Sequence, residues 1–420
     1  MFRRVHKLGA AQTIRPAGGF YPKQAPMLRL TLYALLLATL SSPSLLAQKT
    51  ASDDPAGGGL AGWLKRLDEK RNDRLDRGLP LFTPFAAPSF SPEFGITVSG
   101  GFLYTFKTDR ADSTLQRSSV PAAIGVSSNG SILASTQTTI YGPADRWRGY
   151  FNAWYRDNPD NYWGVGYQNA RDREKGYATG YQRRWWRVNP TFVYRLAPHV
   201  FAGPTVDLNS TELSEATFPV AGDPDVLTDG IANQNAGVGG AVQYDSRDVI
   251  QNPYNGLFLE LRGLTYGTFL GGENEYTAFS VDVRSYHQFG EERRVLAWEI
   301  FSRIVSEGAP WPELTQIGTP FDLRGYIWGR FRDRAGSFAI AEYRHMLRHR
   351  RENDLIGRFG WVVWAGVGLV SDGYESHFSN PFPNAGAGLR FEVEPRMNIR
   401  FDLGVGLETS SFYISFNEAF

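Results

Sequence analysis

The chain has 420 residues and a mass of 47.0 kDa, enough for two or three soluble domains or for one large barrel. Its net charge of +1 gives no reason to expect nucleic acid or another polyanion as a partner. It contains no cysteine, which excludes a disulfide framework, and its 45 glycines and 14% aromatic residues favour strands and turns over helices.

The amino-terminal part predicts export. Residues 1–47 read as an over-long start followed by a signal peptide, with Met27 as initiator, an apolar run from Leu30 to Leu40 and cleavage after Ala47. This run is too short to span a bilayer, which needs roughly 20 apolar residues. An uncleaved signal anchor is the alternative.

Residues 48–92 predict a short periplasmic segment with one amphipathic helix. Between Leu60 and Gly78, apolar residues recur at helical spacing among basic ones, which is typical of a helix lying on a membrane interface; a mobile tether is the alternative. Four prolines between Leu79 and Pro92 predict an extended stretch outside any sheet, because proline donates no ladder hydrogen bond.

Residues 93–420 predict an all-β fold, a transmembrane antiparallel β-barrel. Apolar and polar side chains alternate in one segment after another: Leu403 lies on one face of its segment, and Arg400 and Asp402 lie on the other. A soluble sandwich shows the same alternation but rarely sustains such long strands in succession. At roughly 20 residues per strand and turn, we expect about sixteen strands, with fourteen as the alternative. The first is expected near 95–107, the least regular lie between 109 and 195 and include one near 161–169, and the last lies near 410–419.

The longest later connection runs from Glu307 to Gly336. It carries Arg324, a permanent cation that a polar lumen can hold only with hydrogen-bonding partners. Glu342, in the following strand, is expected to point inward and to pin the loop by contacting Arg324. The alternative is that Arg324 caps a solvated loop.

These segments resemble the BamA/TamA superfamily of outer-membrane assembly barrels (bacterial surface antigens), in a short form without periplasmic POTRA modules. The resemblance rests on four blocks in the family's order. They are Tyr244-Asp245-Ser246-Arg247-Asp248 with Asn252-Pro253-Tyr254-Asn255-Gly256, the tip Leu323-Arg324-Gly325-Tyr326, Ile399-Arg400-Phe401-Asp402-Leu403-Gly404, and Phe412 to Phe420.

The resemblance implies roles for two sets of residues. Leu323, Arg324, Gly325 and Tyr326 would lock the inward-folded outer loop, with Glu342 as lumenal partner. The closing strand and assembly signal would contain Phe412, Ile414, Phe416 and Phe420. Family members often carry Asp-Ala-Gly on the thirteenth strand as a further partner of the arginine, but Val363-Trp364-Ala365-Gly366 offers no carboxylate here.

In function, the resemblance implies insertion or translocation of proteins, or of lipids, at the outer membrane of a Gram-negative bacterium. A weak seam is expected between 95–107 and 410–419. The expected partners are outer-membrane lipid and client membrane proteins or a neighbouring gene's product; the oligomeric state is left open. The alternatives are a passive or plugged channel and, less favoured, a barrel-embedded hydrolase.

No catalytic or metal site is expected. The sequence has no Gly-x-Ser-x-Gly elbow, and His345 and His349 would lie roughly 13 Å apart on a strand, too far for one metal ion. We therefore expect no enzyme, metal or cofactor.

Asp245 and Asp248 flank Arg247 and predict lumenal ion pairs. Five aromatic residues are expected in the girdles at the two membrane–water interfaces of the barrel, namely Tyr162, Trp163, Trp185, Trp186 and Trp361.

Overall fold

The computed structural model describes residues 73–74, 77–172, 179–290, 293–347, 356–394, 396–407 and 409–420. The expected signal peptide and nearly all of the expected amphipathic helix lie outside these described residues. Within them, no helix is both long enough and apolar enough to cross a bilayer.

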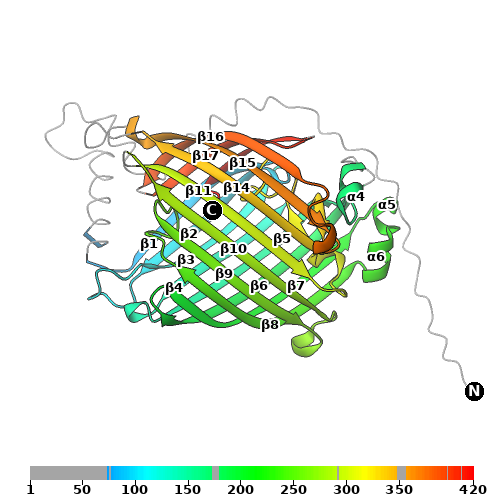
Figure 1. Cartoon of the computed structure of the whole chain (residues 1–420), viewed down its shortest axis with the longest axis horizontal. Coiled ribbons are helices and arrows are strands. Elements are labelled where there is room, and N and C mark those ends of the chain that lie inside the picture. Colours follow the sequence, from blue (N-terminus) through cyan, green and yellow to red (C-terminus); the bar gives the residue numbers. More distant parts are fainter. Residues whose placement is uncertain are drawn as a thin grey trace, which may run out of the picture.

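The described residues form one closed antiparallel barrel of sixteen strands (Figure 1). A small two-stranded sheet lies in the connection between β11 and β14. The barrel strands are β1 (Leu81–Ser91), β2 (Gly95–Phe106), β3 (Ser118–Ser127), β4 (Ile132–Tyr141), β5 (Trp147–Asn161), β6 (Gly180–Ala197), β7 (Val200–Ser214), β8 (Ala232–Asp245), β9 (Gly256–Tyr266), β10 (Tyr276–Gln288), β11 (Arg294–Val305), β14 (Ala335–Met346), β15 (Phe359–Ser371), β16 (Phe382–Glu394), β17 (Met397–Val405) and β18 (Ser410–Phe416).

The remaining elements are short and lie in the connections. They are η1 (Pro143–Asp145), α4 (Tyr167–Asp172), α5 (Phe218–Ala221), α6 (Pro224–Asp229), η2 (Phe269–Gly271), η3 (Trp311–Glu313), β12 (Thr315–Ile317), β13 (Phe331–Asp333), η4 (Ile356–Arg358) and η5 (Tyr374–Ser376). Helices α4, α5 and α6 gather at one end of the barrel (Figure 1), which we call the loop end. The opposite turn end carries tight connections, such as the two residues between β6 and β7.

The barrel wall is apolar outside and polar inside. On β17, the side chains of Leu403 and Val405 are 54% and 50% exposed, whereas Arg400 and Asp402 are fully buried. A soluble sandwich would bury the apolar side chains and expose the charged ones. The observed arrangement fits a wall between lipid and a polar lumen, so the predicted transmembrane antiparallel barrel of about sixteen strands is confirmed.

The first strand lies earlier in the chain than predicted. β1 pairs with β2 along its whole length, although it contains Pro84 and Pro88. Its other edge is the seam of the barrel, where β18 contributes the single residue pair Phe90–Ile414, and prolines are tolerated on such an edge strand. The predicted boundary between residues 92 and 93 is therefore wrong, and the seam lies at β1 rather than at 95–107.

The strand predicted near 161–169 is also wrong. β5 ends at Asn161, and the chain then enters the loop-end connection that contains α4. The ring of Tyr162 is fully buried and lies 4.8 Å from that of Trp311, centroid to centroid, so loop packing holds this segment. The predicted number of strands is right only because the missed β1 offsets this extra strand.

Three of the aromatic residues expected in interfacial girdles face the interior of the protein instead. Tyr162, Trp163 and Trp185 are nearly fully buried. The guanidinium of Arg183 lies 4.3 Å from the ring centroid of Trp185, because alternation along β6 turns both side chains toward the lumen. These rings therefore pack lumenal charges and loops.

The connection between β11 and β14 folds back into the barrel. The side chains of Ile317, Leu323 and Tyr326 are buried in one cluster with the wall residues Trp364 and Phe382. The apolar residues of this loop thus have a core to enter, and the loop occupies part of the lumen.

The last residues also turn inward, where a strand to 419 was predicted. β18 ends at Phe416, and Asn417 adopts a left-handed backbone conformation with φ of 61°. Glu418 and Phe420 are buried, and the ring of Phe420 lies 6.3 Å from that of Tyr286. Phe420 therefore does not share an outer face with the other closing-strand residues.

A closed ladder of this kind should resist detergent until it is heated. We expect the unheated protein to migrate faster than the boiled protein on SDS gels and to fractionate with outer membranes. Protein unfolded in urea beforehand, as a control, should run at the boiled position. One position for all samples, or recovery as a soluble periplasmic protein, would contradict the assignment.

Candidate functional site

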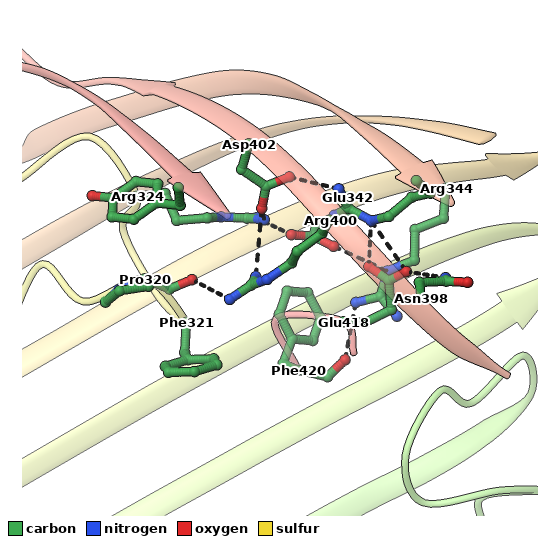
Figure 2. A network of polar contacts seen from close by, with 12 residues as sticks. Pro320, Phe321, Arg324, Glu342, Arg344, Asn398, Arg400, Asp402, Glu418 and Phe420 are labelled. Atoms are coloured by element: carbon green, nitrogen blue, oxygen red, sulfur yellow. Dashed lines mark hydrogen bonds and ion pairs between the residues drawn. The ribbon is translucent and has the colours of Figure 1, made fainter. Parts of the chain in front are cut away.

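A fully buried arginine holds the tip of the lumenal loop. Nη1 of Arg324 donates to Asp402 over 2.7 Å and Nη2 donates to Glu342 (Figure 2). The guanidinium also lies 3.7 Å from the ring centroid of Trp364. A buried cation is tolerated only with partners of this kind. The expected contact with Glu342 is present in the structure, and Asp402 is a second partner that sequence patterns did not assign.

These partners come from three different strands. Glu342 on β14 and Trp364 on β15 are directly opposite in the strand register, and Asp402 lies on β17. β15 is the thirteenth barrel strand, so an aromatic ring stands where the resemblance would place an aspartate. Asp402 supplies the second negative charge from β17.

The loop backbone lies directly against β17. Gly325 has a φ of +119°, and a Cβ there would lie 2.8 Å from the backbone of Val405. A Cβ on Gly404 would lie 2.4 Å from the carbonyl oxygen of Arg324. Both positions therefore require glycine, one for its backbone conformation and both for the close approach.

The other tip residues are engaged as well. The N–H of Gly325 donates to the hydroxyl of Tyr413 on β18 over 3.2 Å. The hydroxyl of Tyr326 donates to the carbonyl of Pro383 on β16 over 2.6 Å, and Leu323 is fully buried. All four residues of the predicted motif therefore bind the wall formed by β14–β18.

The charged network continues toward the turn end. Asp402 accepts a hydrogen bond from Arg390 over 2.6 Å, and Arg390 pairs with Glu418 over 2.9 Å. Glu342 accepts a second bond from Arg344 over 2.9 Å. The inward turn of the last residues thus delivers a carboxylate to the same network (Figure 2).

A further arginine ties the loop to this network. Nη2 of Arg400 donates to the carbonyl of Pro320 over 2.9 Å, and its guanidinium lies 5.0 Å from the ring centroid of Phe321. The two guanidinium groups are not fully hydrogen-bonded, since Nε of Arg324 and Nε of Arg400 are among the buried atoms that have no partner within the described residues. Glu342, Asp402 and Glu418 are each engaged by guanidinium groups, so the arrangement holds segments together.

The residues predicted for the closing strand are placed unequally. Phe412 is exposed on the outer wall, and its ring lies 6.0 Å from that of Phe90 across the seam. Ile414 makes the single seam pair and Phe416 ends the strand, whereas Phe420 lies inside. Their role as an assembly signal stays a prediction.

Alternation along its segment places Asp402 on the lumenal face but does not by itself pair it with Arg324. Asp402 lies on the same polar face as Arg400, within a block already singled out by its alternation. The missing information was strand order, because β17 is separated from β14 by two strands.

The fold and the site together define the class of protein. A closed barrel with an apolar outer wall, a charged lumen and a connecting loop pinned inside by arginine is an outer-membrane β-barrel. Residues 124–420, more than half of the chain, match the model of the Omp85 superfamily domain. The chain therefore belongs to the Omp85 superfamily.

BamA and CdiB are among the solved structures that are similar to the chain. BamA from Haemophilus ducreyi lacking POTRA domains 1–3 matches with a TM-score of 0.53 at 11% identity, covering 90% of this chain and 81% of that one. CdiB from Acinetobacter baumannii matches with a TM-score of 0.50 at 14% identity, covering 81% of this chain and 59% of that one. This chain therefore spans less than two thirds of the CdiB length, and both likenesses concern the fold. No curated protein matches the chain in sequence.

Replacing Arg324 by alanine should destabilise the barrel, because it leaves Glu342 and Asp402 buried and short of a partner. We expect a loss of about 1–3 kcal/mol, measured as a lower urea midpoint of the heat-modifiable band. Arg184→Ala is the control, since Arg184 is 56% exposed and pairs with the equally exposed Glu212. Equal midpoints for the two variants would rule out the anchoring role.

Gly404→Ala should displace the loop tip, because the added methyl group meets the backbone of Arg324. Limited proteolysis of the reconstituted protein should then cleave the loop faster than in the wild type. Gly240→Ala is the matched control, since its nearest neighbour would be at 3.5 Å. The same cleavage rate in both variants would mean that the tip does not need this close approach.

Proposed function

We propose that this barrel inserts proteins into the outer membrane or translocates them across it, with lipids as a second class of client. Membership in the Omp85 superfamily supports the proposal. The observation that carries it is the weak seam between β1 and β18.

The seam lacks pairing over most of β1. Phe90 faces Ile414, so in this register Pro88 would face Phe416, the last residue of β18. Within the part of the chain that the structure describes, residues 81–87 then have no strand partner on that side, because the chain turns inward after Phe416. The gap lies toward the turn end, which we assign to the periplasm, where clients would arrive.

The difference in pairing is large enough to matter. A backbone hydrogen bond contributes about 0.5–1.5 kcal/mol net, so one residue pair holds two strands far less firmly than a full ladder. β17 and β18 pair from Ile399 to Val405, and β1 pairs with β2 throughout. A free strand edge accepts a further strand through its backbone, so the edge of β1 can receive a client strand.

The lumenal loop fixes the other side of the seam. Its tip is bonded to Tyr413 on β18 and to Asp402 on β17. It also reaches the connection between β1 and β2, where the backbone N–H of Trp328 donates to Glu93 over 3.2 Å. Separation of Phe90 from Ile414 would leave the contacts with β17 and β18 intact.

A passive or plugged channel is the second candidate. A cavity of about 180 Å³ borders the lumen and is lined by polar residues that include Arg187, Arg262 and Arg303. Such a cavity suits small polar solutes. A channel would work with the seam closed, which separates the two proposals experimentally.

Closing the seam covalently should stop insertion. Phe90→Cys with Ile414→Cys places a disulfide at the single seam pair in a chain without other cysteines. Liposomes containing the reduced protein should speed the folding of an added, urea-unfolded small outer-membrane barrel, measured by its heat-modifiable band. Oxidation should abolish this acceleration and dithiothreitol should restore it.

The control pair is Ser89→Cys with Thr97→Cys, which links β1 to β2, two strands that stay paired. Its oxidised form should keep full activity. Undiminished activity of the oxidised seam variant would reject seam opening. No acceleration by any form, together with ion conductance, would favour the channel.

A further inference from the structure

One turn-end connection reaches across the barrel mouth. The β8–β9 turn, residues 246–255, contacts Arg396 in the connection between β16 and β17. Around the wall, six strands lie between these two connections, namely β9, β10, β11, β14, β15 and β16. The contact therefore passes across the lumen and not along the wall.

Arg396 holds the β8–β9 turn through three different interactions. Its Nη1 donates to the carbonyl of Asn252 over 2.8 Å, and its Nη2 pairs with Asp248 over 3.2 Å. Its guanidinium lies 3.4 Å from the ring centroid of Tyr254. Hydrogen bond, ion pair and cation–π contact together fix both the position and the orientation of the turn.

The turn is shaped to present these groups. Oδ1 of Asp248 accepts the backbone N–H of Val249 over 2.9 Å and that of Tyr254 over 3.0 Å, which leaves Oδ2 for Arg396. The side chain of Tyr254 is buried in the same cluster as Phe420. The turn thus packs down onto the lumenal core.

The conformation of Arg396 also points to a specific use. Its φ is 67°, a left-handed conformation that glycine adopts freely and that other residues adopt at a cost. The side-chain contacts with Asp248, Asn252 and Tyr254 offset that cost.

We propose that the β8–β9 turn is a clasp that closes the turn end of the lumen, with Arg396 as the residue that holds it shut. Release of Arg396 frees the turn and opens the lumen at that end. Because Arg396 joins β16 to β17, the clasp connects the mouth to the strands beside the seam. It is a property of the barrel and does not depend on the proposed function.

A single cysteine behind the clasp reports on it. Val295 on β11 is buried and lines a small gap together with Asn252 and Tyr254, and the chain has no other cysteine. Val295→Cys in liposomes should react slowly with a membrane-impermeant maleimide. Adding Arg396→Ala should raise the labelling rate at least tenfold, and Arg396→Lys, which keeps only the charge, should give an intermediate rate.

Two variants serve as controls. Arg358 is a half-buried arginine at the same end of the barrel, and it donates to the carbonyl of Val393 over 3.4 Å. Since this contact joins neighbouring parts of the wall, Arg358→Ala should leave the labelling rate unchanged. Tyr254→Phe keeps the ring under the guanidinium and should also leave it unchanged. Heat-modifiable migration verifies that each variant is folded.

Three results would overturn the clasp. They are fast labelling of Val295→Cys with Arg396 present, equal rates with and without Arg396, and the same acceleration by Arg358→Ala.

Discussion

A guanidinium without access to water has to satisfy its charge inside the protein, and much of this structure follows from how Arg324 does so. Two carboxylates, from β14 and β17, and one indole ring, from β15, converge on it. Their positions fix where the loop tip lies, and the close approach of Arg324 to Gly404 follows from that position. The rest of the charged network supports the same two carboxylates, which makes β14–β18 the firmly held side of the barrel.

The sequence predicted the parts of the fold that depend on local alternation. Period two distinguished the outer face of β17 from its inner face, and it placed Glu342 toward the lumen, where it meets Arg324. The partner Asp402 could not be assigned, because its distance from Arg324 depends on strand order and stagger around the ring. The sequence around Trp364 shows only that this segment offers no carboxylate. In the structure, the ring of Trp364 faces the guanidinium of Arg324 directly.

The errors have physical causes. Pro84 and Pro88 indicated that residues 79–92 lie outside the sheet. β1 nevertheless forms, because a strand at the seam can lack backbone hydrogen bonds along one edge. Trp163, Val165 and Tyr167 alternate with glycines and so suggested a strand, yet the side chains of Tyr162 and Trp163 are buried by loop packing between distant segments. Phe420 continues the apolar pattern of the last strand and was therefore expected on its outer face. The left-handed conformation of Asn417 turns the chain inward instead, and this turn brings Glu418 to its buried ion pair with Arg390. The second and third errors concern residues whose partners lie far away in the sequence.

The inward turn after Phe416 has a consequence for the surrounding lipid. It leaves part of β1 with backbone groups that none of the described strands pairs, and in hydrocarbon such groups cost far more than in water. Water or headgroups therefore have to reach this edge, which favours a locally thinned bilayer on that side of the barrel. Acyl-chain length thus becomes a variable that acts directly on one strand edge of this protein.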